Sequence, residues 1–311
     1  MKNLAAALLL FSAFSVFAQE PVKTVDSTRW EKKNTIGFDI SEIAFVNWNA
    51  GGVSSVSGLL KGDFVRRLTL SKSKWGNELT VRYGMNKQDG IEWRKTDDVF
   101  KLESSFGYRR DTASYWYHSA RCSFATQFTE GYAYPNTDRH ISKAFAPAYI
   151  FLGVGAEYAN KPRRINLYLS PLTMKTTLVL DQRLANQGAF GVTPAQFDPV
   201  TGLMTAEGCR SRTELGILVT GHVKADVYKN MQLENKLSLY TDYINNFGNI
   251  DVDWQTGLNM VVNEYVKANV GLHLIYDHDI KAKEEIEGEQ VTVGPKIQLK
   301  QTLGIGVTFN I

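Results

Sequence analysis

The stretch PKIQLKQTLGIGVTFNI (Pro295–Ile311) alternates apolar and polar side chains with little interruption. One face of this alternation is apolar and carries Ile297, Leu299, Leu303, Ile305, Val307, Phe309 and Ile311. The other face is polar or small and carries Lys296, Gln298, Lys300, Thr302, Gly304, Gly306, Thr308 and Asn310. A period of two is typical of a β-strand between an apolar and an aqueous environment. Because the chain also carries a secretory signal, the stretch predicts the closing strand of a transmembrane β-barrel.

The secretory signal lies in residues 1–18. Lys2 precedes an apolar run from Leu4 to Phe17, and Ala18 stands before Gln19, which together are typical of a cleavable signal peptide. Residues 19–34 are polar and non-periodic, and predict a periplasmic lead-in. Residues 35–311 predict the barrel, and the expected location is the outer membrane of a Gram-negative cell.

The composition limits the other fold classes. The chain has 311 residues, 43% of them hydrophobic, and beyond the signal no window approaches the ~20 apolar residues that a membrane helix needs. A net charge of +3 gives no reason to expect a nucleic-acid partner. The two cysteines, Cys122 and Cys209, match no disulfide framework and no metal-ligand spacing, and we expect no cofactor.

About twelve alternating segments separated by turn signals predict an antiparallel, up-and-down barrel. The expected strands are 35–46, 53–68, 76–87, 97–110, 115–129, 143–159, 163–182, 211–228, 231–245, 249–262, 265–279 and 295–311. The seventh contains Ser170-Pro171, where the apolar face switches, so it could be one kinked strand or two short ones.

The connections between these segments alternate in length, as they do in outer-membrane barrels with short periplasmic turns and longer outer loops. The short set is 71–74, 111–114, 160–162, 229–230 and 263–264. The long set is 88–96, 130–142, 183–210 and 280–294, with two shorter members at 47–52 and 246–248. Aromatic residues gather near the short set and predict an interfacial ring: Trp75, Tyr108, Trp116, Tyr158, Tyr228 and Tyr265.

A series of short motifs runs through most of the mature chain. In order they are Phe45-Val46-Asn47-Trp48-Asn49-Ala50-Gly51-Gly52, Trp75-Gly76-Asn77, Tyr83-Gly84, Phe106-Gly107-Tyr108, Thr126-Gln127-Phe128, Ala146-Pro147-Ala148-Tyr149, Ser170-Pro171-Leu172 and Gly188-Ala189-Phe190-Gly191-Val192. Taken in this order they resemble a Bacteroidetes outer-membrane β-barrel family catalogued as a domain of unknown function. The resemblance implies a barrel in the outer membrane, and brings no substrate, cofactor or catalytic residue with it.

The inward faces of the expected strands suggest where a solute could pass. One group of strands gives a basic set of candidate lumen-lining residues: Arg82, Lys101, Arg109 and Arg121. The opposite group gives an acidic set with a histidine: Asp242, Asp251, Asp253 and His273. The two sets could create a field across a water-filled lumen, or the charges could pair and fill the interior. Loop residues that could contact a ligand are Asn47, Trp48, Gly51, Gly52, Phe190 and Phe197, and the 183–210 connection is expected to fold partly over or into the lumen as a gate.

The sequence gives less support to two further interpretations, a lipase site and a metal site. A lipase would need Ser104 beside His118 on the lipid face, but the expected register separates them by roughly 10 Å. Asp277-His278-Asp279 could hold a divalent cation, although the neighbouring lysines favour a solvated loop.

The sequence therefore favours a passive channel or uptake barrel for a small polar solute. The alternatives are a structural or assembly component that binds a partner protein and, more remotely, a lipid-modifying enzyme; no catalytic or metal residue is assigned. Expected partners are outer-membrane lipid and, through the C-terminal strand, the barrel-assembly machinery.

Overall fold

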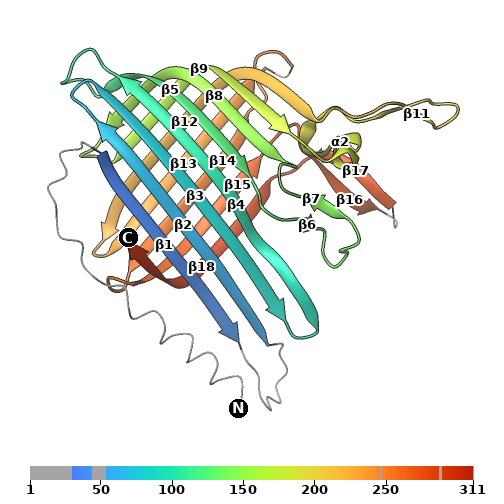
Figure 1. Cartoon of the computed structure of the whole chain (residues 1–311), viewed down its shortest axis with the longest axis horizontal. Coiled ribbons are helices and arrows are strands. Elements are labelled where there is room, and N and C mark those ends of the chain that lie inside the picture. Colours follow the sequence, from blue (N-terminus) through green and yellow to red (C-terminus); the bar gives the residue numbers. More distant parts are fainter. Residues whose placement is uncertain (1–29, 44–53, 246, 287–288, 311) are drawn as a thin grey trace.

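The computed structural model describes residues 30–43, 54–245, 247–286 and 289–310 (Figure 1). The expected signal peptide, most of the expected lead-in and the Asn47–Gly52 loop lie outside these residues. No helix within the described residues is long and apolar enough to cross a membrane.

Within the described residues, twelve antiparallel strands close into one barrel, as expected. Their order around the wall is β1-β18-β15-β14-β13-β12-β9-β8-β5-β4-β3-β2, so almost every neighbour in space is a neighbour in sequence. The strands are β1 (Trp30–Ile43), β2 (Ser55–Thr69), β3 (Ser73–Gln88), β4 (Ile91–Tyr108), β5 (Trp116–Thr126), β8 (Ala148–Asn160), β9 (Ile165–Leu178), β12 (Ser211–Tyr228), β13 (Met231–Asp242), β14 (Asp251–Val261), β15 (Val266–Tyr276) and β18 (Gln298–Asn310).

Two strands begin five or more residues earlier than the sequence predicts. β1 starts at Trp30 instead of Thr35, because Trp30 pairs with Leu68 and its ring packs 5.8 Å from that of Trp75. The expected long loop 88–96 is wrong: β4 starts at Ile91, and Asp89-Gly90 makes a tight turn with Gly90 at φ 77°. An Asp-Gly pair readily adopts the positive φ angles that a two-residue hairpin turn needs.

The seventh barrel strand, β9, is a single strand with an irregularity at its middle. Its register with β8 shifts between Val154 and Ala156, and its register with β12 shifts between Gly216 and Leu218. Ser170 and Pro171 lie at this bulge, and Ser170 donates a hydrogen bond to the Val154 carbonyl at 2.9 Å. The switch of faces seen in the sequence therefore reflects a β-bulge.

The two ends of the barrel differ as expected. One end carries only short turns, and the aromatic side chains that gather there pair with one another, such as Trp116 with Tyr158 and Tyr265 with Phe309. The other end carries every additional element of the described chain: β6 (Gly131–Tyr132), β7 (His140–Ser142), α2 (Gln182–Asn186), η2 (Ala189–Gly191), β10 (Gln196–Phe197), β11 (Met204–Ala206), β16 (Lys281–Ile286) and β17 (Glu289–Pro295) (Figure 1).

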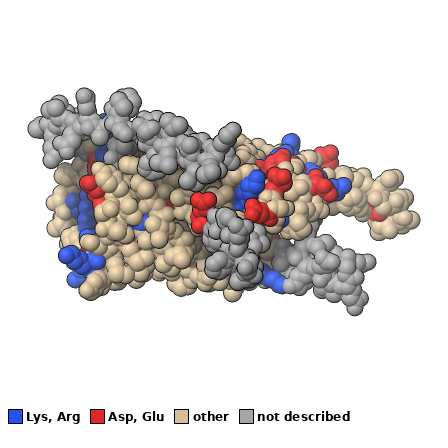
Figure 2. Space-filling view, turned by 90° about the horizontal axis from the view of Figure 1, so that it is seen from below, with Lys and Arg blue, Asp and Glu red and all other residues tan. Residues whose placement is uncertain are grey.

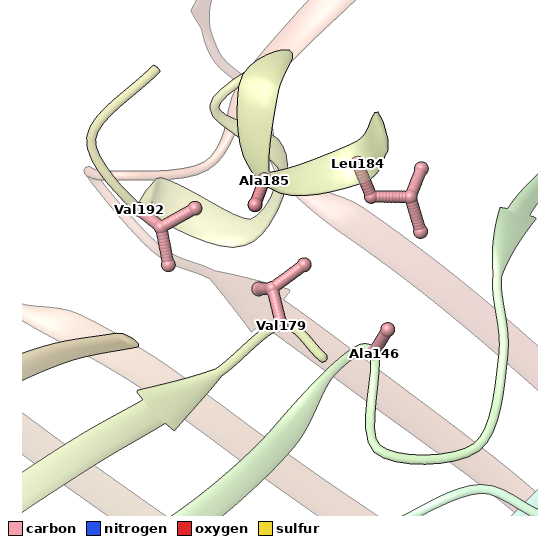
Figure 3. Packing of buried hydrophobic residues seen from close by; sticks show 5 residues of the cluster. All are labelled: Ala146, Val179, Leu184, Ala185 and Val192. Atoms are coloured by element: carbon pink, nitrogen blue, oxygen red, sulfur yellow. The ribbon is translucent and has the colours of Figure 1, made fainter. Parts of the chain in front are cut away.

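A small apolar cluster fixes α2 and η2 to the rim of the barrel (Figure 3). Leu184, Ala185 and Val192 pack on Val179 and Ala146, and all five side chains are buried. From this anchor the β10–β11 hairpin projects away from the barrel (Figure 1). The 183–210 connection is thus divided into a packed base and an extended arm.

The outer wall is largely aliphatic. On the face seen in Figure 2, charged side chains gather toward the two ends, and the wall between them is mostly uncharged. Cys122 lies on the outer face of the wall, in a shallow groove of about 490 Å³ with Phe106, Leu152 and Leu172. Cys122 and Cys209 are both free.

Candidate functional site: the barrel interior

The strand register places alternate side chains inside the barrel. Lys101 of β4 pairs with Thr80 on one side and Ala125 on the other, and Arg121 of β5 pairs with Ser105 and Gly153. These residues share one face, because directly opposed residues in an antiparallel ladder point to the same side of the sheet. Their neighbours Leu102 and Cys122 point outward.

A buried charge network fills one side of the interior toward the outer loops. Lys175 of β9 reaches Asp251 of β14 at 2.8 Å, Asp277 at 3.4 Å and Glu214 of β12 at 3.6 Å. Since β12 and β13 lie between β9 and β14 in the wall, the bond to Asp251 crosses the interior. Arg212 extends the network to Glu214 at 3.0 Å and to Asp279 at 2.8 Å.

A second network lies on the same side nearer the short turns. Glu157 of β8 accepts a hydrogen bond from Lys74 of β3 at 2.6 Å and lies 3.3 Å from Arg121. Arg121 also donates to Asn166 at 2.8 Å, and its guanidinium lies 4.1 Å from the centre of the Tyr168 ring. The Lys74–Glu157 pair again joins strands that are not neighbours in the wall.

An apolar layer separates the two networks. Tyr168, Leu218 and Tyr240 form a buried cluster, with Phe151 packed against it. The side chains of Lys175 and Glu214 are only 7% and 3% exposed. The β8–β9–β12 side of the interior, together with Tyr240 near the outer end of β13, is therefore packed, and it acts as a buttress for the wall.

The opposite side of the interior is wet. Inward side chains there are far more exposed: Lys101 at 42%, Glu103 at 47%, Lys300 at 44%, Lys236 at 49% and Asp253 at 48%. These residues lie on β4, β13, β14 and β18, and they include both positive and negative charges. Solvent can therefore reach the charged side chains that these strands point into the barrel.

Most charges on the wet side also have partners. His273 lies 2.9 Å from Asp253. Arg82 holds both oxygens of Asp63 at 2.8 and 2.9 Å. Lys300 of β18 reaches Asp97 of β4 at 2.8 Å, across three intervening strands of the wall. Local pairing of this kind weakens any field between opposite walls.

The predicted lumen-lining residues thus fall into four places. Arg82, Lys101, Asp253 and His273 line the wet side, and Arg121 and Asp251 belong to the buried networks. Arg109 lies past the end of β4, where it donates to the carbonyls of Ser71 and Ser114. Asp242 is buried and accepts from the backbone of Ile244 and Asn245, so it organises its own loop. The structure brings Asp253 and His273 together, and it separates Arg109 from the rest.

The predicted loop residues are also separated. Phe190 packs against the rim cluster, with φ 58°. Phe197 lies on the projecting arm and is 56% exposed, so this part of the 183–210 connection does not fold over the lumen. The packed base alone reaches the lumen edge, where the Gly191 carbonyl accepts from Arg212 at 3.0 Å. Asn47, Trp48, Gly51 and Gly52 lie outside the described residues.

A polar latch holds the rim together. Asp181 caps α2 by accepting from the Leu184 N–H at 3.0 Å, and it pairs with Lys143 at 2.7 Å and with His140 at 3.0 Å. Burial raises the pKa of Asp181, but these three donors outweigh it and hold the pKa below its ordinary value. The latch therefore ties the 140–147 segment to the base of the long connection.

The sequence reading missed Lys175, Glu214, Arg212 and Glu157, which carry the buried networks. Because of the bulge in β9, the alternation of the sequence does not show that the Lys175 side chain points into the barrel. Contacts between residues far apart in the sequence, such as Lys74 with Glu157, could not be predicted without the strand order of the closed barrel. Asp277 and Asp279, expected in a solvated loop, are instead partners of Lys175 and Arg212.

The alternative chemistry finds no support in the geometry. Ser104 pairs with Cys122, while His118 pairs with Tyr108. Four residues along a strand separate Ser104 from His118, which is roughly 14 Å. No group of His, Cys, Asp and Glu suited to a metal ion occurs among the described residues.

A family model is similar to part of the chain. Residues 40–132 match the family described as "Protein of unknown function (DUF3078)", which confirms the resemblance to a family of unknown function over this part. No curated protein matches the chain.

Among solved structures, the translocator domain of the autotransporter NalP from Neisseria meningitidis has a TM-score of 0.39 and 8% identity, covering 99% of this chain and 95% of that one. An outer-membrane channel from Pseudomonas putida F1 has a TM-score of 0.40 and 10% identity, covering 93% and 100%. The NanC porin has a TM-score of 0.36 and 10% identity, covering 90% and 100%. Likenesses of this strength do not assign a function.

Proposed function

We propose that this protein is an outer-membrane channel that admits small polar solutes through the wet side of its barrel. The proposed location rests on the wall itself. Its lipid-facing residues, such as Leu102, Leu152 and Val270, are aliphatic and exposed, and aromatic residues ring the short-turn end. An aliphatic band of this kind beside an aromatic ring is stable in a bilayer and costly in water.

One observation carries the transport proposal: charged inward side chains are nearly half exposed. Lys101, Glu103, Lys236, Asp253 and Lys300 are 42% to 49% exposed although they point into the barrel. A filled interior would bury these groups, at a cost of several kcal/mol for each unpaired ion. Because both signs are present, the proposed solutes are small polar or zwitterionic molecules.

Ion selectivity of the purified barrel in a planar bilayer tests this proposal. Asp253→Asn should shift the reversal potential in a salt gradient toward anions, and Lys236→Gln should shift it toward cations. Asp198→Asn, which removes the same charge on the projecting arm, is the matched control and should leave the potential unchanged. Both shifts should shrink toward ~1 M salt, where the Debye length is about 3 Å. Unchanged selectivity in both lumen variants would contradict the channel.

The projecting arm favours a second function, the docking of a partner protein. Phe197, Val200, Leu203 and Met204 are 56%, 91%, 70% and 47% exposed on the β10–β11 hairpin. Its base is fixed separately, since Ala195 donates to Asn186 and Cys209 to Thr193. Replacing residues 196–206 by a short Gly-Ser linker should therefore leave conductance intact. If the purified barrel shows no conductance, either with or without the arm, the result would favour the docking function over the channel.

A further inference from the structure

The seam that closes the barrel is only partly paired. β1 pairs with β2 along its whole length, from Trp30 to Ile43. With β18, however, it pairs only from Thr35↔Asn310 to Asp39↔Gly306. Within the described residues, no ladder pair joins residues 40–43 of β1 to β18. Residues 298–305 of β18 are thus paired with β15 on one edge and unpaired on the other.

The exposure of the side chains agrees with an opening at this place. Leu303, Ile305 and Ile40 are 81%, 62% and 60% exposed, against 45% for Val270 in the fully paired wall. The inward residues Lys300 and Thr302 are exposed as well. Both faces of β18 are therefore accessible over the same stretch in which its ladder is missing.

The opening lies at the height of the lipid chains. Phe309 packs 5.8 Å from Tyr265 in the aromatic ring at the short-turn end. A membrane-spanning strand crosses the hydrocarbon in about ten residues, so the stretch from Phe309 back to Leu299 spans it. The unpaired residues 298–305 fall in the half of this stretch that is nearer the outer loops.

Asp39 is the last residue of β1 that pairs with β18, and it marks the end of the opening that is nearer the short turns. Asp39 lies against Gly306 and Gly304, where an added Cβ would come within 1.8 and 3.1 Å of its carboxylate oxygens. Asp39 accepts a hydrogen bond from Lys61 at 2.7 Å, while its Oδ1 is buried without a hydrogen-bond partner. The Asp39 carboxylate therefore fills the space on the inner side of Gly304 and Gly306, and it closes the seam on the short-turn side of the unpaired edge.

An unpaired strand edge cannot face lipid alone, because each unsatisfied backbone group costs several kcal/mol in hydrocarbon. The inner side of this edge offers water and the polar residues Lys300 and Thr302. The outer side offers the aliphatic residues Ile40, Leu303 and Ile305. A single molecule satisfies both sides only if it has a polar head and an apolar tail.

We propose that the β1–β18 seam is a lateral port, through which an amphipathic molecule with an acyl chain passes between the lumen and the outer leaflet. The head group lies along Thr302 and Lys300 and bonds the free backbone edge. The acyl chain lies between Ile40 and Leu303 and remains in the membrane. The port is a path through the wall, separate from the axial path of the channel.

Fluorescence quenching from the lipid phase tests the port. With Cys122 and Cys209 replaced by serine, a fluorophore is attached to Thr302→Cys at the seam or to Gln255→Cys. Gln255 is the matched control, since it is also inward and exposed but its strand is paired on both edges with Lys236 and His273. The vesicles contain phosphatidylcholine with a nitroxide on its acyl chain.

Lipid quenching should be several-fold stronger at position 302 than at 255, whereas aqueous iodide should quench both. Equal and weak lipid quenching would overturn the port. A head-to-head dimer cross-linked through position 302 would also overturn it and assign the free edge to a second copy. Conductance of the same preparations keeps the two proposals apart: a silent barrel with strong quenching at 302 contradicts the channel alone.

Cysteine pairing gives an independent measure of the seam. Phe38 and Val307 are opposed in the ladder, so Phe38→Cys with Val307→Cys should form a disulfide. Glu42 and Leu303 would be opposed if the same register continued, but an opening holds their Cα atoms beyond the ~7 Å that a disulfide tolerates. Glu42→Cys with Leu303→Cys should therefore remain reduced under conditions that oxidise the first pair. Equal oxidation of both pairs would show a closed seam.

Discussion

At the scale of single residues, the interior is organised by where each charge finds its partner. The sequence alternation assigns Arg82, Lys101, Asp253 and His273 to the inner face, and the strand register gives them the same face, because alternation along a strand is a local property. It could not foresee that Lys175 meets Asp251, since that contact depends on the curvature and closure of the whole wall. Asp242, which serves its own loop, has the same sequence signature as a lumen-lining acid.

Asp181 gives a pH-dependent prediction at this scale. Its pKa is lower in the folded protein than in the unfolded chain, so its contribution is complete above an ordinary Asp pKa of about 4 and is lost as the pH falls below it. Asp181→Ala should remove the latch at neutral pH and cost about 1 kcal/mol for the lost helix cap.

Hydrogen exchange of the α2 amides measures the latch. Exchange at Leu184 to Gln187 should accelerate in the variant, and in the wild type it should accelerate, after correction for intrinsic rates, only below about pH 4. Asp198→Asn, on the arm of the same connection, is the control and should leave these amides unchanged. Loosening of α2 between pH 7 and pH 5 would contradict the assignment.

At the scale of elements, the strands follow from period-two patterning and the turns from local chemistry. The Asp89-Gly90 turn was readable in the sequence, and its omission made β4 too short. The early start of β1 depends on Trp30 packing against Trp75, a contact between distant parts of the chain. The division of the 183–210 connection into base and arm could not be predicted, because it depends on the rim formed by Val179 and Ala146.

The β9 bulge brings neighbouring backbones unusually close, which gives a prediction for two glycines. A Cβ at Gly155 would lie 2.0 Å from the Leu169 carbonyl oxygen, and one at Gly216 would lie 2.0 Å from that of Thr241. Gly155→Ala and Gly216→Ala should each destabilise the barrel by about 1–3 kcal/mol, because the backbone must move. Gly221→Ala, with no atom within 4 Å of the added carbon, is the control and should be neutral. The temperature at which the folded band disappears in detergent gels measures the difference; equal temperatures would exclude a tight bulge.

At the scale of the whole molecule, a packed buttress and a wet side share one interior. The sequence left open whether the inward charges fill the lumen or line it, and the structure shows both, on opposite sides. Composition and alternation could not decide this, because Lys175 and Lys236 occupy equivalent inward positions on their strands. Their side chains differ only in exposure, 7% against 49%.

This pair of lysines provides the prediction at the molecular scale. Lys175→Met should lower the free energy of unfolding by about 3–5 kcal/mol, because it removes the cation that pairs with the largely buried carboxylates of Asp251 and Asp277. Lys236→Met should cost at most about 1 kcal/mol, since its partner Glu234 keeps other cations. Urea unfolding in detergent compares the two variants. Similar losses would mean that the interior is uniformly packed.

Modification of single cysteines during conductance recording tests the wet lumen most directly. In a barrel with Cys122 and Cys209 replaced by serine, Lys236→Cys places a thiol on the wet side, and Thr173→Cys places one on the buried side. A charged methanethiosulfonate reagent should reduce the stepwise conductance of the first variant and leave that of the second unchanged. A barrel without conductance, or one whose conductance is unaffected by modification at position 236, would contradict the water-filled channel.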